Sequence, residues 1–504
     1  MNLGELLRDT IVRELRGDAR QEVLSLAYDS RQAQPGSLFF AIEGEQADGH
    51  RFIGQALEKG AAGVVSERPV PPDFPAVWVF VPRIRRALSD VSRAFYRRPE
   101  SRLKLAGVTG TNGKTTTAYL IRSIFEAAGV KTALFGTIEY RLGARAIPAP
   151  HTTPESLDLA RYLAEWVEQG GEAAVMEVSS HALAQERVWG FHFVSGVFTN
   201  LTGDHLDYHK NMENYFAAKR RLFEGVGTAP PDVGVINMDD PWGARLLETK
   251  QPRQITYGLN SNAQVKVRHF THGPGGIRAS LSTAEGKLEI ESPLMGRANL
   301  ENILAAVAVA QGWGIASEKI QQGITALRQV PGRFERIDEG QPFVVLVDYA
   351  HTHDALRNAL AIAREITRNQ LIVVFGCGGD RDRTKRPLMG EAAGNLSDQV
   401  VLTSDNPRNE DPITIMNDAI VGLQKSPKPY WTEVDRRKAI RTALELAHEG
   451  DVVLIAGKGH ETYQVLKDGP VPFDDREVAR KILREMGFGP SPGLRPPSPA
   501  GRGQ

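Results

Sequence analysis

The chain has 504 residues, which is too long for a single hydrophobic core and predicts roughly three domains. Hydrophobic residues make up 41% of the chain and charged residues 24%, a composition typical of a soluble globular protein. Basic and acidic residues number 61 each, so there is no global charge that would gather nucleic acid or bind a membrane surface.

Cysteine content and the N-terminus indicate where the protein works. The single cysteine, Cys377, excludes an internal disulfide and is typical of a reducing compartment. The first residues, MNLGELLRDTIVRELRGDAR, form an amphipathic pattern with acidic residues, unlike a secretion signal. No run approaches about 18 uncharged apolar residues, so no membrane span is predicted. We therefore expect a cytoplasmic protein.

Residues 1–100 are predicted to form a first domain. SLFFAI and AAGVVSE have the composition of strands, the stretch 50–60 that of a helix, and RIRRALSDVSRAFYRRP that of a basic helix. No catalytic group of residues is apparent in this domain from chemistry alone.

The next segment, LAGVTGTNGKTTT, is an apolar run that breaks into a glycine-rich turn ending in Gly-Lys-Thr-Thr. Lys114 supplies a positive charge for the outer phosphates of a nucleotide, and Thr115 offers a hydroxyl to Mg²⁺. Three glycines are expected to bend the backbone and turn its N–H groups inward: Gly107, Gly110 and Gly113. This pattern predicts a site for a nucleoside triphosphate.

The residues after the turn support that prediction. Apolar residues at Leu120, Ile121, Ile124 and Phe125 have helical spacing, so the helix N-terminus would point at the anion. The strict phosphate-loop pattern has glycine where this chain has Val108, and an ordinary strand–turn–helix is the alternative.

Strands and helices alternate from the turn onward, which favours α/β domains with mostly parallel sheets. The predicted boundaries are 101–331 for a central domain, 332–488 for a C-terminal domain and 489–504 for a disordered, Pro- and Gly-rich tail. A polar patch around 260–292 is predicted to be antiparallel, and an Ala-rich helix is expected at 300–312.

Polar residues follow most strands of the last two domains, and ligands of open α/β sheets bind at the carboxyl ends of strands. Glu177 ends the strand AAVMEV and is a candidate anchor for Mg²⁺. Ser179 has the simpler role of capping the following helix. His205 lies among metal-competent groups, but zinc would want more Cys or His ligands and Mg²⁺ prefers oxygen. Lys219, followed by two arginines, has the pattern of a solvated helix face.

The C-terminal domain carries charges of both signs at its strand ends. Arg381 and Arg408 are forked cations suited to carboxylates or phosphates, whereas Asp405 and Glu461 are suited to an ammonium group. Such a site fits a zwitterion such as an amino acid. The two domains together predict a cleft that holds a nucleotide and a co-substrate.

Several motifs in this order resemble the Mur ligase family over nearly the whole chain to about residue 488. They are TGTNGKTTT, EVSSHAL, FTNLTGDHLDYH, AAKRRLF, NLENILAA, PGRFE, DYAHT, GGDRDRTKRP and GKGHE. The DNPR run and the N-terminal DSR and EQADGH are similar to the branch of the family that adds 2,6-diaminopimelate. The resemblance implies three domains: a small α/β domain that binds a UDP-linked substrate, a central P-loop-type ATPase, and a Rossmann-like C-terminal domain that binds an amino acid.

The resemblance also implies residue roles. Residues implied to bind ATP are Gly110, Thr111, Asn112, Gly113, Lys114, Thr115, Thr116, Asn299, Arg333 and Asp348. Those implied to hold magnesium are Thr115, Glu177, His205 and a carbamylated Lys219, and the catalytic set is Lys114, Lys219, His205 and Glu177. The uridine end would contact Tyr28, Ser30, Glu45, Gln46 and Ala47. The muramoyl-peptide would contact His151, Thr152, Thr153, Ser179, Gln185 and Arg187. The amino acid would contact Arg381, Asp405, Asn406, Pro407, Arg408, Gly457 and Glu461.

The reaction implied is ATP-dependent addition of meso-diaminopimelate to UDP-N-acetylmuramoyl-L-alanyl-D-glutamate through an acyl phosphate, in peptidoglycan precursor synthesis. The implied enzyme is a monomer that needs Mg²⁺ and binds neither nucleic acid nor membrane. Four alternatives remain: a lysine-adding family member, a folylpolyglutamate synthase, a P-loop ATPase without ligase activity, and a nucleotide-binding regulatory module without turnover. Two positions depart from the usual family pattern: His151, where asparagine is more common, and His353, where proline follows DYAHT.

Overall fold

A computed structural model describes residues 1–44, 47–260 and 262–489 of the chain. Its contacts divide the chain into two compact units. The first contains Met1–Lys266 and Leu304–Gly323, and the second contains Val267–Ile303 and the chain from Ile324 onward. The predicted domain boundaries at 100, 331 and 488 remain a prediction. The predicted tail, apart from Gly489, lies outside the described residues.

The first unit begins with a five-stranded sheet in the order β1-β5-β4-β3-β2, parallel except where β1 pairs with β5. Successive residues of a strand face opposite sides of the sheet, so Phe40 joins one apolar cluster and Phe39 another. The elements are α1 (Leu3–Leu6), β1 (Glu14–Arg16), β2 (Ser25–Ala27), η1 (Ser30–Gln32), β3 (Ser37–Phe40), η2 (Gly49–Phe52), α2 (Ile53–Glu58), β4 (Gly63–Ser66), β5 (Val77–Phe80), α3 (Ile84–Phe95) and η3 (Pro99–Arg102).

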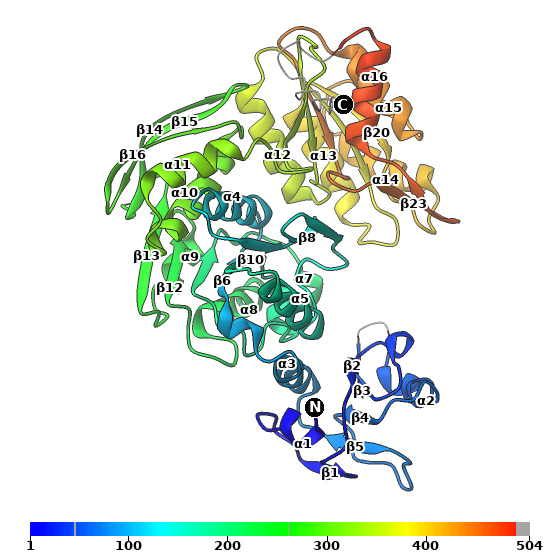
Figure 1. Cartoon of the computed structure of the whole chain (residues 1–504). Helices are drawn as coiled ribbons and strands as arrows, with labels where there is room; N and C mark the ends of the chain where they lie inside the picture. The colour runs from blue at the N-terminus through cyan, green and yellow to red at the C-terminus, as the bar shows by residue number, and fades with distance from the viewer. Residues whose placement is uncertain (45–46, 261, 490–504) are drawn as a thin grey trace, which may run out of the picture. The chain divides into compact units, whose positions relative to one another are not determined.

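A second sheet of this unit includes strands in the order β13-β12-β11-β6-β10-β7-β8-β9, and those from β13 to β7 are parallel. The parallel strands are almost entirely buried, as expected when helices cover both faces. The elements, which Figure 1 shows in cyan to green, are β6 (Lys104–Thr109), α4 (Lys114–Ala127), β7 (Thr132–Phe135), β8 (Glu139–Leu142), β9 (Arg145–Pro148), α5 (Ser156–Glu168), β10 (Ala173–Glu177), α6 (Ser180–Ala184), β11 (Ser195–Phe198), α7 (Leu206–His209), α8 (Met212–Glu224), β12 (Val233–Asn237), α9 (Pro241–Leu246) and β13 (Arg253–Gly258).

Along the chain, three more strands and two helices follow β13 and precede the C-terminal sheet. They are β14 (Val265–Gly273), β15 (Gly276–Thr283), β16 (Gly286–Ser292), α10 (Arg297–Gly312) and α11 (Ser317–Ala326). β15 and β16 pair antiparallel, which confirms the predicted antiparallel patch, and α10 confirms the predicted Ala-rich helix.

The second unit contains a six-stranded sheet in the order β17-β18-β22-β19-β20-β21, parallel except for the edge pair β17–β18. Its elements are β17 (Glu335–Ile337), β18 (Val344–Asp348), α12 (His353–Ile366), β19 (Leu371–Cys377), α13 (Lys385–Leu396), β20 (Gln399–Ser404), α14 (Pro412–Leu423), β21 (Tyr430–Glu433), α15 (Arg436–Leu446), β22 (Val452–Ala456), β23 (Tyr463–Leu466), β24 (Gly469–Pro472) and α16 (Asp475–Glu485).

Both faces of this sheet are covered, which explains the continuous apolar runs of its strands. In β19, Val373 and Phe375 pack with residues of α12, α13 and α14, whereas Ile372 and Val374 pack with residues of α15 and α16. Alternation along one strand therefore supplies two cores. The α/β fold with mostly parallel sheets is confirmed. Several strands, most of them short, were not predicted: β1, β2, β5, β7, β8, β9, β13, β17, β21, β23 and β24.

None of the helices in residues 1–44, 47–260 and 262–489 is both long and apolar enough to cross a bilayer.

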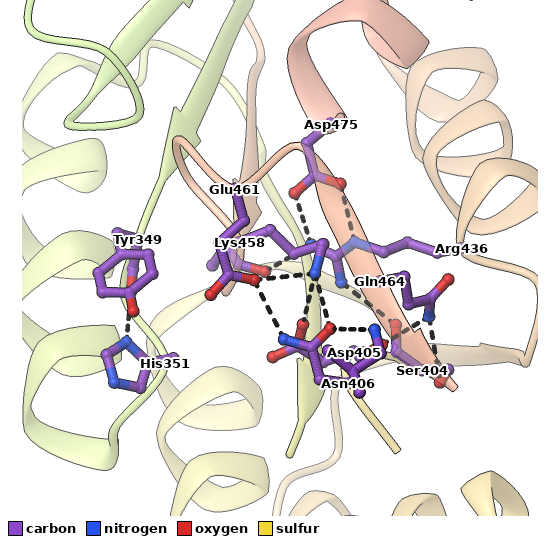
Figure 2. A network of polar contacts seen from close by, with 12 residues as sticks. Tyr349, His351, Ser404, Asp405, Asn406, Arg436, Lys458, Glu461, Gln464 and Asp475 are labelled. Carbon is purple, nitrogen blue, oxygen red and sulfur yellow. Dashed lines mark hydrogen bonds and ion pairs between the residues drawn. The ribbon is translucent and has the colours of Figure 1, made fainter. Parts of the chain in front are cut away.

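A fully buried ion pair ties the carboxyl edge of the C-terminal sheet together (Figure 2). The Arg436 guanidinium donates to both oxygens of Asp475 at 2.8 and 2.7 Å, and neither side chain is exposed. It also donates to the carbonyl of Ala456, at the end of β22, at 2.9 Å. The pair thus links the starts of α15 and α16 to a strand end.

Arg436→Met is expected to lower the free energy of unfolding by about 3–5 kcal/mol, because Asp475 would be left buried and unpaired. The measurement is urea denaturation followed by circular dichroism. The control is Arg437→Met, at the next position, which is partly buried; it should change the free energy of unfolding by less than about 0.5 kcal/mol. Equal effects of the two substitutions would contradict the prediction.

Candidate active site

The glycine-rich turn joins the buried strand β6 to the N-terminus of α4, as the sequence predicts. Gly110 and Gly113 have φ values of +147° and +84°, backbone conformations that are sterically unfavourable for residues with a Cβ atom. A Cβ atom at Gly110 would lie 1.9 Å from Thr199 Oγ1. Gly107 instead lies inside β6, so its expected role in the turn is wrong: a Cβ there would come within 2.9 Å of the Phe193 ring. Gly107 permits close packing.

Side chains of the loop after β11 hold the turn in place. The Asn112 N–H donates to Asn200 Oδ1 at 2.9 Å, and the Thr199 hydroxyl donates to the Asn112 carbonyl at 2.6 Å. The Thr111 N–H donates to the Asn200 carbonyl at 2.8 Å. Thr115 and Thr116, in the first turn of α4, are 4% and 6% exposed.

Two lysines converge on the same carbonyl oxygen of this turn. Lys114 Nζ lies 2.9 Å from the Gly110 oxygen, and Lys219 Nζ, from α8, lies 2.7 Å from it. Lys219 is buried, so its interpretation as a solvated helix face is wrong. Burial, and then the charge of Lys114, lower the pKa of Lys219 well below its usual value. Its amine is therefore neutral at a lower pH than that of an exposed lysine.

Glu177 is the last residue of β10 and is 1% exposed, as predicted for a strand-end acid. Its two oxygens accept from the N–H of Thr137 at 2.8 Å and the hydroxyl of Thr137 at 3.1 Å. A Cβ atom at Gly136 would lie 2.4 Å from Glu177 Oε1. Sequence reasoning missed both residues, because their partner Glu177 lies 40 residues along the chain from Thr137.

His205, the residue before α7, has a left-handed backbone, φ +52°, and its ring lies 4.8 Å from that of His181. Partial burial of its half-exposed ring, together with the charges of His181, Lys114 and Lys219, lowers the pKa of His205 to about 4, although Asp204 opposes the shift. The ring is therefore neutral at pH 7, and a neutral imidazole has a lone pair free for a metal.

These groups suit Mg²⁺, which takes only part of its coordination shell from protein, better than a metal whose ligands all come from the protein. No three His, Cys, Asp or Glu side chains of the described residues gather as a metal site. Mg²⁺ is usually held by one or two carboxylates, with substrate phosphates and water completing its shell. One buried carboxylate, Glu177, and the Thr115 hydroxyl in the glycine-rich turn fit that pattern of coordination.

The residues expected to hold a muramoyl-peptide lie together around Thr153. Its hydroxyl donates to the Glu177 carbonyl at 2.8 Å and accepts from the Ser179 N–H at 3.1 Å. Arg187 donates to the Thr153 carbonyl at 2.9 Å and pairs with Glu155 at 3.0 Å. The remaining contacts are those of Thr152 with Thr137, Gln185 with Arg187, and the His151 carbonyl with the Tyr140 hydroxyl. Ser179 also caps α6, as predicted.

The residues expected to bind the uridine end are less closely connected. The Ser30 hydroxyl donates to Gln55 at 2.6 Å, whereas the Tyr28 hydroxyl donates to Asp158 of α5 at 2.6 Å. The Ala47 carbonyl accepts from the Gly44 N–H at 2.9 Å. Glu45 and Gln46 lie outside the described residues.

Three residues expected at the nucleotide belong to the second unit. Asp348 ends β18 and accepts from the N–H groups of Phe334 and Ala350, both at 2.9 Å. Burial raises the pKa of Asp348, which the neighbouring Arg333 opposes. The Asn299 amide donates to the carbonyl of Met295 at 2.8 Å.

The C-terminal sheet brings several predicted amino-acid contacts together at its carboxyl edge (Figure 2). Asp405 and Asn406 follow β20, and Gly457 and Glu461 follow β22. The Asn406 amide donates to Glu461 Oε2 at 3.0 Å. Arg408, after Pro407, has φ +54° and donates to the Gly379 carbonyl at 2.7 Å, while Arg381 is exposed.

Comparisons with known proteins agree with this architecture. Three domain families match: the Mur ligase family catalytic domain over residues 22–96, the Mur ligase middle domain over 108–310, and the Mur ligase glutamate ligase domain over 332–459. A relative from Solibacter usitatus (strain Ellin6076) is 54% identical over 490 residues, which cover 97% of this chain and 99% of the relative. The chain belongs to the Mur ligase family.

The Solibacter relative is named UDP-N-acetylmuramoyl-L-alanyl-D-glutamate–2,6-diaminopimelate ligase, as is one from Geobacter metallireducens, 45% identical over 96% of this chain and 99% of that protein. A solved structure with the same name has a TM-score of 0.70 at 34% identity, covering 97% of this chain and 99% of its own. A structure of MurF from Acinetobacter baumannii shares the fold, with a TM-score of 0.67 at 19% identity. The match covers 96% of this chain and 98% of the MurF chain.

If Glu177 binds Mg²⁺ as the sequence predicts, Thr137→Val should raise the Mg²⁺ concentration needed for half-maximal activity about 10–100-fold, because the groups that orient a metal-binding carboxylate affect metal affinity that strongly. The valine keeps the size and the backbone N–H of residue 137 but removes the hydroxyl bond to Glu177. The measurement is a Mg²⁺ titration of phosphate release. An unchanged titration curve would contradict the prediction.

Proposed function

We propose that this Mur ligase joins meso-2,6-diaminopimelate to the γ-carboxylate of the D-glutamyl residue in UDP-N-acetylmuramoyl-L-alanyl-D-glutamate, with ATP as the energy source. The observation that carries the proposal is the 54% identity, over nearly the full length of both chains, to a relative with that name. The buried Asp405 and the partly buried Glu461, near Arg408 at one sheet edge, support a zwitterionic amino acid as the second substrate.

A carboxylate resists attack by an amine because its negative charge repels the nucleophile. In the proposed reaction, the γ-carboxylate displaces ADP from the terminal phosphorus of ATP and becomes an acyl phosphate. The amine of diaminopimelate then attacks the acyl carbon, and the tetrahedral intermediate expels phosphate and a proton. The first step concentrates negative charge on the phosphoryl oxygens, so cations and N–H donors directed at them lower its barrier.

The chain's own residues divide this work. We assign the turn from Gly110 to Thr116 to the phosphates of ATP, with Lys114 as the cation beside the transferred group. Glu177, Thr115 and the neutral His205 would hold Mg²⁺, which when bound neutralises charge on the phosphates. The lowered pKa of Lys219 favours carbamylation, because only a neutral amine adds to CO₂. A carbamate supplies the oxygen ligand that Mg²⁺ prefers.

Thr153, Ser179 and Arg187 would receive the muramoyl-peptide next to Glu177, which places the reacting carboxylate near the phosphate turn. We further propose that the enzyme acts in the cytoplasm, where ATP and UDP-linked precursors are found, and as a monomer. The lone buried cysteine agrees with a reducing compartment.

Phosphate release tests the function directly. The wild-type protein is incubated with ATP, Mg²⁺ and UDP-N-acetylmuramoyl-dipeptide, and single amino acids are added in turn. We expect release only with both substrates present, and much faster release with diaminopimelate than with lysine. Release with ATP alone would indicate an ATPase that does not ligate. Faster release with lysine would indicate the lysine-adding alternative.

Arg408→Ala should weaken use of diaminopimelate by about 2–5 kcal/mol, at least about 30-fold in KM, because Arg408 can form a paired hydrogen bond with the distal carboxylate. The KM for ATP should stay within about twofold. Substrate kinetics measures both constants, and Arg437→Ala is the control. Equal losses for diaminopimelate and ATP would contradict the assignment.

A further inference from the structure

Lys458 is a buried lysine at the carboxyl edge of the C-terminal sheet, and neither the reaction nor the predicted contacts use it. Its side chain is 0% exposed. Its Nζ lies 3.0 Å from Asn406 Oδ1, 3.0 Å from Glu461 Oε2 and 3.5 Å from Asp405 Oδ1 (Figure 2). All three partners are predicted contacts of the amino-acid substrate.

We propose that Lys458 is a positioning residue for the amino-acid site: its ammonium group cancels one of the two carboxylate charges there and holds Glu461 and Asn406 in the orientation that receives an ammonium group of the incoming amino acid. The inference rests on the proposed function and extends it to a residue to which no role has been assigned.

Contacts of Asn406 fix which way its amide group faces. Its Oδ1 atom accepts from Lys458 Nζ and from the Val465 N–H, the latter at 2.9 Å. With both donors on the oxygen, the amide nitrogen must face Glu461, and it donates to Oε2 at 3.0 Å. Asn406 therefore transmits the position of Lys458 to Glu461.

Glu461 is held through one oxygen only. Lys458 and Asn406 both contact Oε2, and within the described part of the chain no bond is found to Oε1. The carboxylate is 16% exposed, whereas the lysine beneath it has no exposure. The arrangement thus presents one oriented oxygen to a ligand and keeps the cation that orients it out of reach.

Lys458 and the two carboxylates that it contacts carry a net charge of minus one, while Arg408 at the same sheet edge is a separate cation suited to a carboxylate. Asp405 and Glu461 contribute two negative charges and Lys458 one positive charge, while Arg436 and Asp475 neutralise each other. Burial raises the pKa of the nearby Tyr349 to about 12, so its hydroxyl is neutral. One residual negative charge matches one ammonium group. Without Lys458, two close carboxylates would share the site with no cation between them.

The backbone around Lys458 explains how a lysine reaches this place. Gly457 and Gly459 on either side have φ values of +119° and +54°. A Cβ atom at Gly459 would lie 2.8 Å from the Tyr349 backbone and 2.7 Å from the Gly332 carbonyl. The two glycines let the chain turn sharply at the end of β22, which directs the lysine between Asp405 and Glu461.

The test compares Lys458→Met with Lys458→Arg and with the control Lys467→Met, an exposed lysine in the β23–β24 turn. KM is measured separately for diaminopimelate, ATP and the UDP-linked substrate. We expect Lys458→Met to raise KM for diaminopimelate at least tenfold and to leave the other two constants within twofold. Lys458→Arg, which keeps the charge, should recover most of the loss, and Lys467→Met should match the wild type.

An unchanged KM for diaminopimelate in Lys458→Met, or an equal rise in all three constants, would overturn the proposal. If the methionine variant does not fold, Lys458→Gln, which keeps a hydrogen-bond donor without the charge, is measured in its place. Failure of both neutral variants to fold while Lys458→Arg folds would also overturn it, because the charge would then serve the fold. A wild-type protein that ligates no diaminopimelate would instead refute the proposed function.

Discussion

The carbonyl oxygen of Gly110 accepts hydrogen bonds from two lysines at once, and much of the nucleotide site depends on that convergence. Lys114 comes from the helix after the turn and Lys219 from a helix farther along the chain, 109 residues from Gly110. Burial, and then the charge of Lys114, lower the pKa of Lys219, so Lys219 loses its proton more readily than an exposed lysine. Lys114, which keeps its charge, is the cation suited to the phosphates of a nucleotide. One geometric fact thus accounts for an anion site and for a reactive amine beside it.

The chain contains a second buried lysine, Lys458, in opposite surroundings. Lys219 lies against a carbonyl oxygen and the ring of Tyr215, with another cation nearby, whereas Lys458 contacts two carboxylates and an amide oxygen. Burial alone therefore does not determine what a lysine does. The charges that surround it decide whether it is available for chemistry or serves to hold acidic groups in place.

Much of the fold could be predicted from the sequence because the signals were local. Long apolar runs such as LIVVFGC and the helical spacing after the glycine-rich turn each fix one element. The placement of Glu177 at a strand end came from the same pattern. The burial of Lys219 did not, because it depends on β6 and α8 being neighbours, and nothing near AAKRRLF reports that contact. Thr137 and Gly136 were missed for the same reason: their partner, Glu177, lies 40 residues from Thr137.

Gly110 and Thr199 are so close that no side chain fits between the phosphate turn and the strand beside it. Together with the bonds from Asn200, this contact fixes the turn in one shape before any ligand arrives. A nucleotide that enters such a turn does not have to order it, so little conformational entropy is lost on binding. The loop is preorganised, and the energy of phosphate binding remains available for the chemical step.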